Sequence, residues 1–342
     1  MNLVKYLYPL GSLYGWGLQL RNRLYNNGIF RSVRPPVFSI CVGNLALGGT
    51  GKTPLTEYLI ELFKSNDIGI AVLSRGYKRK TTGYLQASVE TSSEEIGDEA
   101  FQIHQKFPDV KVFVCENRVE GVHRLYGENP EIQLVLLDDA FQHRAIKANK
   151  NILVTRYDKL YVDDHYIPAG TLRDHKIRAS DADIVIVSNC PANLDVTEKN
   201  SITGKLKLMN NQKLFFSGVS YQSPELLFSD QNAIDELDRY IAVTGIAKPG
   251  NFIKHVDEEY EIVKHFKYPD HYNFTSDDID RWKSKIAEDG SIGIITTEKD
   301  ATRLIQFEKE LNGIPVVVLP IKNHFYGDEK KLESLLVGWL NK

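Results

Sequence analysis

Short apolar runs alternate with segments of helical periodicity from about residue 37 onward. Each run is nearly continuous in hydrophobic side chains, as expected for strands that are buried on both faces of a parallel sheet. Strands are predicted at residues 37–43, 69–74, 110–115, 132–139, 151–156 and 183–189. Their alternation with helical segments is typical of a doubly wound, mainly parallel α/β domain.

A second and smaller set of alternating elements follows a further apolar run at 213–222. The polar stretch 223–238 is predicted to be a linker. After it we expect strands at 239–247, 261–269, 291–299 and 314–322, with helices at 276–287 and 300–311. The pattern therefore predicts four parts. They are an N-terminal helix with its lead-in at 1–36, a larger α/β domain at 37–222, the linker, and a smaller α/β domain at 239–342.

The N-terminal segment 1–26 is rich in leucine and tyrosine. Polar residues and Pro9 keep its apolar runs below the ~18 residues that a transmembrane helix needs, and no signal-peptide cleavage pattern follows. Leu3, Leu7, Leu10 and Leu13 fall roughly on one helical face. Such a helix either lies in a bilayer interface or packs against the body of the protein, and this pattern alone leaves both interpretations open.

The net charge of −3 conceals an uneven distribution. No acidic residue precedes Glu57, whereas the same region carries six cations, which are Lys5, Arg21, Arg23, Arg31, Arg34 and Lys52. A basic front on an acidic body favours an anionic surface or ligand near the N-terminus. The composition, 42% apolar and 25% charged over 342 residues, argues against a disordered or polytopic membrane chain, and three scattered cysteines argue against a disulfide framework.

A strand, a glycine-rich loop and a helix follow one another around residue 50, with the loop reading GNLALGGTGKTP (43–54). In such a loop, backbone N–H groups converge on phosphate oxygens, a lysine reaches the β- and γ-phosphates, and the next hydroxyl ligates Mg²⁺. Ala46 stands where the standard pattern has glycine, so the loop is a variant. With this loop, the doubly wound domain is expected to be P-loop NTPase-like. The residues with these roles are Gly48, Gly49, Thr50 and Gly51 for the backbone, Lys52 for the lysine, and Thr53 for the metal.

Carboxylates occur at two places where phosphoryl transfer would need them. Asp138 and Asp139 end a predicted buried strand, which is where a Mg²⁺ ligand lies beside a phosphate loop, although an ordinary strand-ending turn would look the same. Asp98 precedes a helical stretch. It is either the N-cap that satisfies free backbone amides or a base that accepts a hydroxyl proton.

Cationic and imidazole groups extend this set of candidates. Arg75 opens a basic loop that suits an anionic ligand or simply solvent, and Arg173 ends a rigid turn where it either meets phosphate or forms a structural ion pair. His271 lies beside Asp270 on a loop, as an orienting group for a base or as a structural histidine. The stretch 297–300 resembles a guanine-reading motif only superficially, because its lysine is adjacent to its aspartate, and this argues against a GTPase.

Taken together, the motifs resemble those of the tetraacyldisaccharide 4′-kinase family of lipid A biosynthesis. The departures from the family pattern are Ala140 where glycine is expected, Thr171 where proline is expected, and Asp174 where glutamate is expected. The matching strings keep the family's order: GNLALGGTGKTP (43–54), SRGY (74–77), GDEA (97–100), LLDDAFQHR (136–144), PAGTLRD (168–174), TGIAKPGNF (244–252), PDHYNF (269–274) and TTEKDATRL (296–304).

The resemblance implies transfer of the γ-phosphoryl group of ATP to the 4′-hydroxyl of a tetraacyldisaccharide 1-phosphate, which gives lipid IVA. It also implies that Asp98, paired with His271, is the base, with Lys52 as a further catalytic group. Mg²⁺ is then expected near Thr53 and Asp138 or Asp139. The residues expected near substrate or nucleotide phosphate are Arg75, Arg118, Gln142, His143, Arg173 and Asp174.

An acylated lipid substrate gives the N-terminal helix a role, namely to bring the site to the cytoplasmic face of the inner membrane as a peripheral contact. No nucleic-acid partner is expected. The alternative hypothesis is a P-loop ATPase or GTPase switch that acts on a protein partner.

Overall fold

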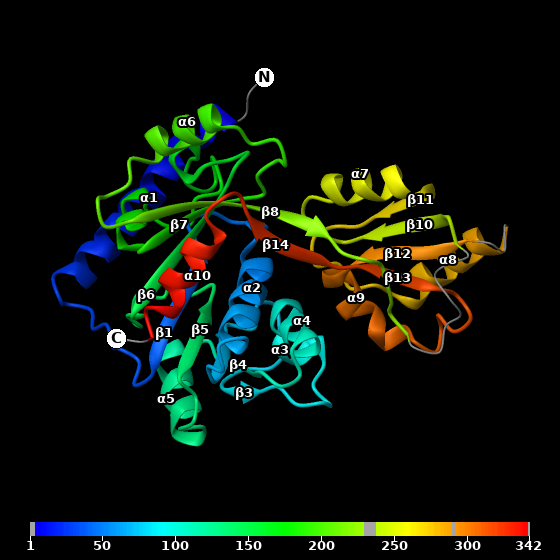
Figure 1. Ribbon diagram of the computed structural model, residues 1–342, viewed down its shortest axis with the longest axis horizontal. Coiled ribbons are helices and arrows are strands. Elements are labelled where there is room, and N and C mark those ends of the chain that lie inside the picture. Colours follow the sequence, from blue (N-terminus) through cyan, green and yellow to red (C-terminus); the bar gives the residue numbers. More distant parts are fainter. Residues whose placement is uncertain (1–3, 229–236, 289–291, 341–342) are drawn as a thin grey trace.

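The computed structural model describes residues 4–228, 237–288 and 292–340, which form two sheets that lie side by side (Figure 1). The larger sheet has the strand order β14-β8-β7-β6-β1-β5-β2-β4-β3. Its neighbours run parallel, apart from β3 beside β4 and β14 beside β8. The strands are β1 (Phe38–Asn44), β2 (Ile70–Ser74), β3 (Leu85–Gln86), β4 (Lys111–Val114), β5 (Leu134–Asp138), β6 (Lys150–Arg156), β7 (Ile184–Ser188), β8 (Lys213–Tyr221) and β14 (Ile321–Phe325).

Helices cover both faces of this sheet, because its strands are apolar on both sides. One face is buried by α2, α4 and α10, and the opposite face by α5 and α6. The doubly wound arrangement expected from the sequence is therefore confirmed. The helices of this body are α1 (Val4–Asn26), α2 (Lys52–Lys64), α3 (Ser93–Ile96), α4 (Asp98–Lys106), α5 (Arg118–Glu128), α6 (Val196–Leu206) and α10 (Glu329–Val337), with 3₁₀ turns at Tyr161–Asp163 and Lys176–Asp181.

The smaller sheet has the order β11-β10-β12-β13-β9, in which the added edge strand β9 is antiparallel. Helices α8 and α9 pack on one face around the fully buried Trp282, and α7 packs on the other. Its elements are β9 (Glu225–Leu226), β10 (Arg239–Thr244), α7 (Gly250–Glu259), β11 (Glu261–Lys267), α8 (Ser276–Ala287), β12 (Gly293–Thr297), α9 (Glu298–Leu304), a 3₁₀ turn (Ile305–Phe307) and β13 (Val316–Leu319).

The end of the chain differs from the prediction of a second domain that runs from 239 to 342. The apolar run 314–322 was expected to be one strand, but the chain breaks at Pro320 and its two halves enter different sheets. Proline has no N–H to donate to a ladder, so it cannot continue a central strand. After it, β14 pairs with β8 of the larger sheet, and α10 buries Leu332 and Leu336 in the larger core.

The boundary before the second domain also differs from the expected linker at 223–238. Residues Glu225–Leu226 form β9 and pair with β13, so this stretch already belongs to the smaller sheet. Residues 229–236 of the expected linker lie outside the described residues. Figure 1 shows that β8 and β14 run next to each other where the two bodies meet.

Helix α1 packs on the larger body through its small residues. Gly11, Gly15, Leu18 and Asn22 are buried at helical spacing, and a side chain at Gly15 would lie 2.7 Å from the ring of Tyr166. The opposite side carries large apolar side chains in contact with solvent, which are Leu10, Leu13, Trp16 and Leu20. The amphipathic pattern is therefore inverted relative to an ordinary surface helix. Leu3 lies outside the described residues.

Candidate active site

The glycine-rich loop lies between the end of β1 and the start of α2 and is held from two sides. The Asn44 side-chain amide donates to the Thr50 hydroxyl at 2.7 Å, and the Ser188 hydroxyl donates to the Thr50 carbonyl at 2.7 Å. Gly48 and Gly51 adopt φ angles of 96° and 79°, which residues other than glycine rarely adopt. The loop thus has the sequence context and the backbone that a phosphate-binding loop requires.

Asp139, directly after β5, is surrounded by cations. The Lys52 ammonium lies 3.6 Å from Oδ1 of Asp139, and the Arg173 guanidinium donates to the same oxygen. Arg173 also donates to the Asn44 side-chain oxygen at 2.5 Å. Burial would raise the pKa of Asp139, but Lys52 and Arg173 hold it below its usual value. In this arrangement Asp139 is an ion-pair partner that positions both cations beside the loop.

Asp138 differs from its neighbour because its side chain is nearly fully buried and its Oδ1 has no hydrogen-bond partner. Burial raises the pKa of Asp138 to about 7, and the negative charges of Glu99 and Asp139 add to this effect. An unpartnered buried carboxylate oxygen is costly unless a cation or donor completes it. Asp138, with the hydroxyl of Thr53 near the start of α2, therefore fits a Mg²⁺ ion.

No group of three or more histidine, cysteine or acidic residues that could hold a metal by itself occurs among the described residues.

Asp98 is the first residue of α4, and its cap is Gly97 rather than Asp98 itself, so the N-cap interpretation is wrong. Gly97 is required there, because its φ is 85° and a Cβ would lie 2.7 Å from the Tyr77 carbonyl oxygen. The Asp98 carboxylate is left free to point toward the smaller domain. Its Oδ2 lies 2.9 Å from Nδ1 of His271 and 3.2 Å from a guanidinium nitrogen of Arg303.

The charge state of Asp98 follows from these contacts. Burial would raise its pKa, but the hydrogen bond from His271 and the charges of Arg303 and Lys299 hold the pKa below its usual value. Asp98 is therefore an ionised, oriented carboxylate at the junction of the two domains. The expected pairing of Asp98 with His271 is present in the structure.

A second cluster gathers around His143 in the loop after β5. Burial lowers the pKa of His143 to about 4, and the charges of Arg118, Arg75 and Arg21 lower it further. Arg118 is 3% exposed, and one of its guanidinium nitrogens donates to the carbonyl of Glu116. Nε of Arg118 and Nε2 of His143 have no hydrogen-bond partner. Unpartnered donors and excess positive charge are the features of a site for an anion.

Gln142 lies next to this cluster and is tied to the phosphate loop. Its side-chain amide donates to the Asn44 carbonyl at 2.5 Å, and its backbone carbonyl accepts from Arg21 of α1 at 2.9 Å. The structure thus brings Gln142, His143, Arg75 and Arg118 to the same edge of the sheet, as the sequence motifs led us to expect.

Asp174 is placed differently from the expectation of a substrate contact. Its side chain is fully buried, accepts from the Asn22 amide of α1 at 3.2 Å, and lies within 4 Å of Arg21 and Arg178. A carboxylate enclosed in this way anchors α1 to the turn that carries Arg173. The shorter side chain of aspartate, compared with the glutamate expected, suits this contact with a helix that packs closely.

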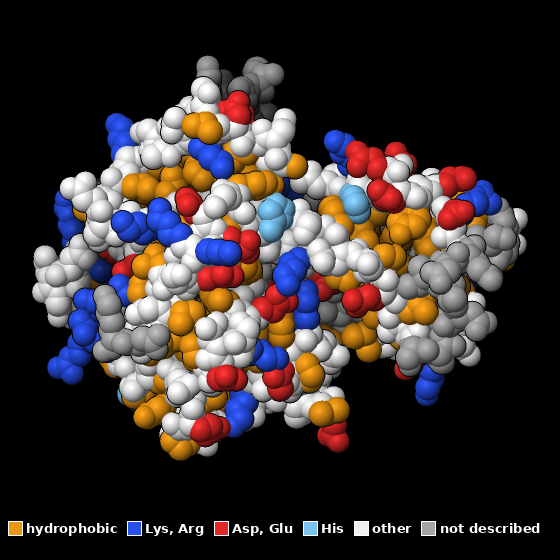
Figure 2. Space-filling view, viewed as in Figure 1, with side chains coloured by type: hydrophobic (Ala, Val, Ile, Leu, Met, Phe, Trp, Pro, Cys, Tyr) orange, Lys and Arg blue, Asp and Glu red, His pale blue; other side chains and the backbone are white. Residues whose placement is uncertain are grey.

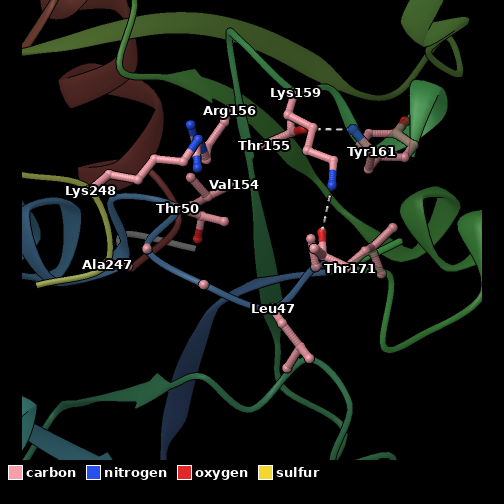
Figure 3. Close-up of a pocket in the computed structure, with 14 residues that line it drawn as sticks. Leu47, Thr50, Val154, Thr155, Arg156, Lys159, Tyr161, Thr171, Ala247 and Lys248 are labelled. Carbon is pink, nitrogen blue, oxygen red and sulfur yellow. Dashed lines mark hydrogen bonds between the residues drawn. The ribbon is translucent and has the colours of Figure 1, made fainter. Parts of the chain in front are cut away.

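A cavity of about 200 Å³ lies beside the phosphate loop and is lined by its residues 45–50. Figure 3 shows Lys248 and Arg156 on one side of it and Lys159, Tyr161 and Thr171 on the other. Lys248 comes from the smaller domain and forms an ion pair of 3.0 Å with Asp158 of the larger domain. The cavity is therefore lined by both domains.

Sequence reasoning missed five residues that contribute to these sites. Asn44 lies in the GNLALGGTGKTP string and Glu99 in the GDEA string, but neither residue was given a role. Lys299 and Arg303 lie in the TTEKDATRL string, which matched the family and was weighed against a guanine-reading motif, but neither residue was given a role. Arg21 was counted as a surface cation.

Comparison with known proteins places these features in one family. The model of the family LpxK, tetraacyldisaccharide-1-P 4′-kinase, matches residues 3–341. A tetraacyldisaccharide 4′-kinase of Bacteroides fragilis is 40% identical over 331 residues, which cover 93% of this chain and 88% of that protein. One of Flavobacterium johnsoniae is 40% identical over 346 residues, covering 100% and 99%.

The fold comparison agrees with the sequence comparison. The crystal structure of an apo-form LpxK from Aquifex aeolicus in complex with ATP superposes with a TM-score of 0.77 at 28% identity, covering 99% of each chain. Among the described residues, no helix has the length and apolar character to span a membrane.

Proposed function

Because this chain belongs to the tetraacyldisaccharide-1-P 4′-kinase family, we propose that Asp98, oriented by His271, is the base of the phosphoryl transfer that it catalyses. The reaction is the ATP-dependent phosphorylation of the 4′-hydroxyl of a tetraacyldisaccharide 1-phosphate, which forms lipid IVA in lipid A biosynthesis. The family assignment favours this function over a P-loop switch that acts on a protein partner.

The observation that carries the proposal is the 2.9 Å contact between Asp98 and His271 across the two domains. A hydroxyl that attacks phosphorus must lose its proton, and an ionised carboxylate within hydrogen-bond reach can accept it. His271 and Arg303 both occupy Oδ2 of Asp98. Oδ1 is therefore the oxygen left to take the proton from the substrate hydroxyl.

The phosphate loop and its cations supply the remaining requirements. The backbone of Gly48–Gly51 and the ammonium of Lys52 would hold the β- and γ-phosphates of ATP. The Arg173 guanidinium would neutralise negative charge on the transferred phosphoryl group. Thr53 and Asp138 would hold Mg²⁺, which when bound offsets the negative charge of the phosphates. The cavity in Figure 3 adjoins the loop and is the proposed place of the rest of the nucleotide.

The cationic cluster around His143 is the proposed site for the anionic part of the lipid substrate. Arg75 is exposed and Arg118 is buried with an unpartnered Nε, so the cluster offers both an accessible and a fixed donor. Arg21 belongs to α1, which makes the membrane-facing helix a neighbour of this site. A phosphate monoester has the charge and the acceptor oxygens that these donors require.

Helix α1 is the proposed contact with the cytoplasmic face of the inner membrane. Its outer stripe exposes Leu13 and Trp16 at 66% and 62%, whereas its glycine side packs on the protein. Large apolar and aromatic side chains that face solvent next to arginines are typical of interfacial helices. The protein would then meet its acylated substrate as a peripheral membrane protein.

Replacement of Asp98 tests the base assignment. In Asp98→Asn we expect turnover to fall by about 10²- to 10⁴-fold, the usual contribution of a general base, with nucleotide affinity nearly unchanged. Asp109→Asn, an exposed aspartate paired with Lys64, is the matched control and should retain normal turnover. Near-normal turnover of Asp98→Asn would show that another group accepts the proton.

A further inference from the structure

The second nitrogen of His271 has a partner that the base mechanism does not use. Lys299, the second residue of α9, places its ammonium 3.1 Å from Nε2 of His271. The same ammonium lies 3.9 Å from Glu99 and 3.8 Å from Asp270. The Lys299 ammonium therefore lies between His271 and Asp270 of its own domain and Glu99 of the larger domain.

The hydrogen-bonding chemistry of the two groups decides where the ring proton lies. An ammonium has donors only, so Nε2 of His271 must accept the hydrogen bond from Lys299. A neutral imidazole that accepts at one nitrogen carries its proton on the other. The proton is thus on Nδ1, from which it is donated to the carboxylate of Asp98.

We propose that Lys299 is a positioning residue that holds His271 in the Nδ1–H tautomer and so orients the Asp98 carboxylate for proton abstraction. The proposal rests on the role of Asp98 given above. In this role Lys299 acts only through His271, and it contacts neither the transferred phosphoryl group nor the acceptor hydroxyl.

The surroundings of His271 show why a cation is needed at this point. Among the described residues, Asp98, which also pairs with Arg303, lies at Nδ1 of the ring, and Lys299 and Asp270 lie on the Nε2 side. The ring of Tyr77 packs edge-on at 5.6 Å and carries no charge. Without Lys299, Nε2 would face the Asp270 carboxylate at 3.9 Å, which favours a proton on Nε2.

A proton on Nε2 has a direct consequence for Asp98. In the Nε2–H tautomer, the bare Nδ1 lone pair would face the carboxylate and the orienting hydrogen bond would be lost. Removal of Lys299 also removes one of the positive charges that hold the pKa of Asp98 down. The pKa of Asp98 should then rise toward its usual value, and the acidic limb of the kcat profile should move to higher pH.

The wild-type protein gives the first test, by ¹⁵N NMR of histidine-labelled full-length chain near neutral pH. We expect the His271 signals of an Nδ1–H tautomer, assigned by comparison with His271→Gln. A wild-type ring protonated on Nε2 alone would overturn the proposal, whatever the variants do.

The variants give the second test. In Lys299→Met we expect the Nε2-protonated ring, a loss of turnover of about 10- to 100-fold, and an acidic limb displaced to higher pH. Lys299→Arg, which also donates, should restore the tautomer and most of the turnover. Lys322→Met, which loses an exposed pair with Glu61, is the control. An unchanged tautomer and pH profile in Lys299→Met would contradict the proposal.

The two proposals fail in different ways. If Asp98→Asn retains turnover, the base assignment is wrong, although the ring proton can still be on Nδ1. If Asp98→Asn is inactive but Lys299→Met has the tautomer and pH profile of the wild type, only the role of Lys299 is wrong. Should Lys299→Met fail to fold, Asp270→Asn replaces it. With Lys299 in place, that variant should keep Nδ1–H, and a switch to Nε2–H would overturn the proposal.

Discussion

Lys106 and Glu298 are 192 positions apart in the sequence, yet their ammonium and carboxylate meet at 2.8 Å across the two domains. The same ammonium is 2.8 Å from Glu57 of α2, the helix that starts at the phosphate loop. One lysine therefore bridges the nucleotide-binding helix to the first turn of α9. On the face shown in Figure 2, side chains of both charges gather where the two bodies meet.

The bridge should contribute measurably to stability. Lys106→Met leaves the buried carboxylate of Glu57 next to that of Glu298 with no cation between them, and we expect a loss of about 2 kcal/mol. Urea denaturation measures this change. Lys64→Met breaks an exposed pair with Asp109 and should cost less than about 1 kcal/mol. Equal losses in both variants would contradict a special role for Lys106.

Glu57 should make the protein less stable as the pH rises toward 7. Burial, and after it the charge of Glu298, raises the pKa of Glu57 to about 7, although Lys106 opposes this. Between its ordinary value and 7 the native state binds a proton that the unfolded chain does not, so the free energy of unfolding falls with rising pH.

The pH dependence of thermal unfolding, measured without Mg²⁺, tests this expectation. Asp138 has a raised pKa for the same main reason and adds to the same slope. Glu57→Gln should therefore flatten the dependence in part rather than abolish it. A slope that Glu57→Gln leaves unchanged would assign the effect to other groups.

Mg²⁺ binding should depend on pH through Asp138. Its pKa of about 7, raised by burial and by Glu99 and Asp139, means that much of the carboxyl is protonated at pH 6. A protonated carboxyl cannot ligate the metal, so apparent affinity for Mg²⁺ in the presence of a non-hydrolysable ATP analogue should be weaker at pH 6 than at pH 8. Calorimetric titration at both pH values measures the difference, and Asp138→Asn should remove it.

The outer stripe of α1 should control binding to lipid. The double change Leu13→Glu and Trp16→Glu places two carboxylates on the face that we expect to enter the interface, and binding to vesicles that contain anionic lipid should fall at least tenfold. Cosedimentation measures this. Val89→Glu changes an apolar residue that is 96% exposed elsewhere on the surface and is the control. Equal effects of the two variants would locate the membrane contact elsewhere.

The sequence pattern predicted the central strands of the larger sheet, such as β2, β5 and β7, because each is a continuous apolar run that is buried on both faces. The pattern failed where contacts between distant segments of the chain determine the structure. The run around Pro320 reads as one strand, and only the break at proline sends its halves to different sheets. In the sequence, Asp174 is part of a charged turn, and its burial depends on Asn22 of α1, 152 positions away.

The candidate site shows the same division. The phosphate loop is local in sequence, so its residues could be predicted from spacing alone. The contact of Asp98 with His271 joins distant segments and was expected only through the family resemblance. Lys299 was missed because its partners, Glu99 and Asp270, come from two separate parts of the chain that meet only in the folded protein.

The antiparallel pairing of β8 with β14 has a consequence for how this enzyme is built. Tyr221 and Ile321 are partners in register, so everything between them is an insertion whose two ends are adjacent. A short turn could join these strands and close the larger sheet without the inserted module. The remaining body would keep the phosphate loop but lose His271 and Lys299 together. The proposed base, Asp98, is thus carried by the larger body, whereas His271 and Lys299, which orient it, both belong to the inserted module.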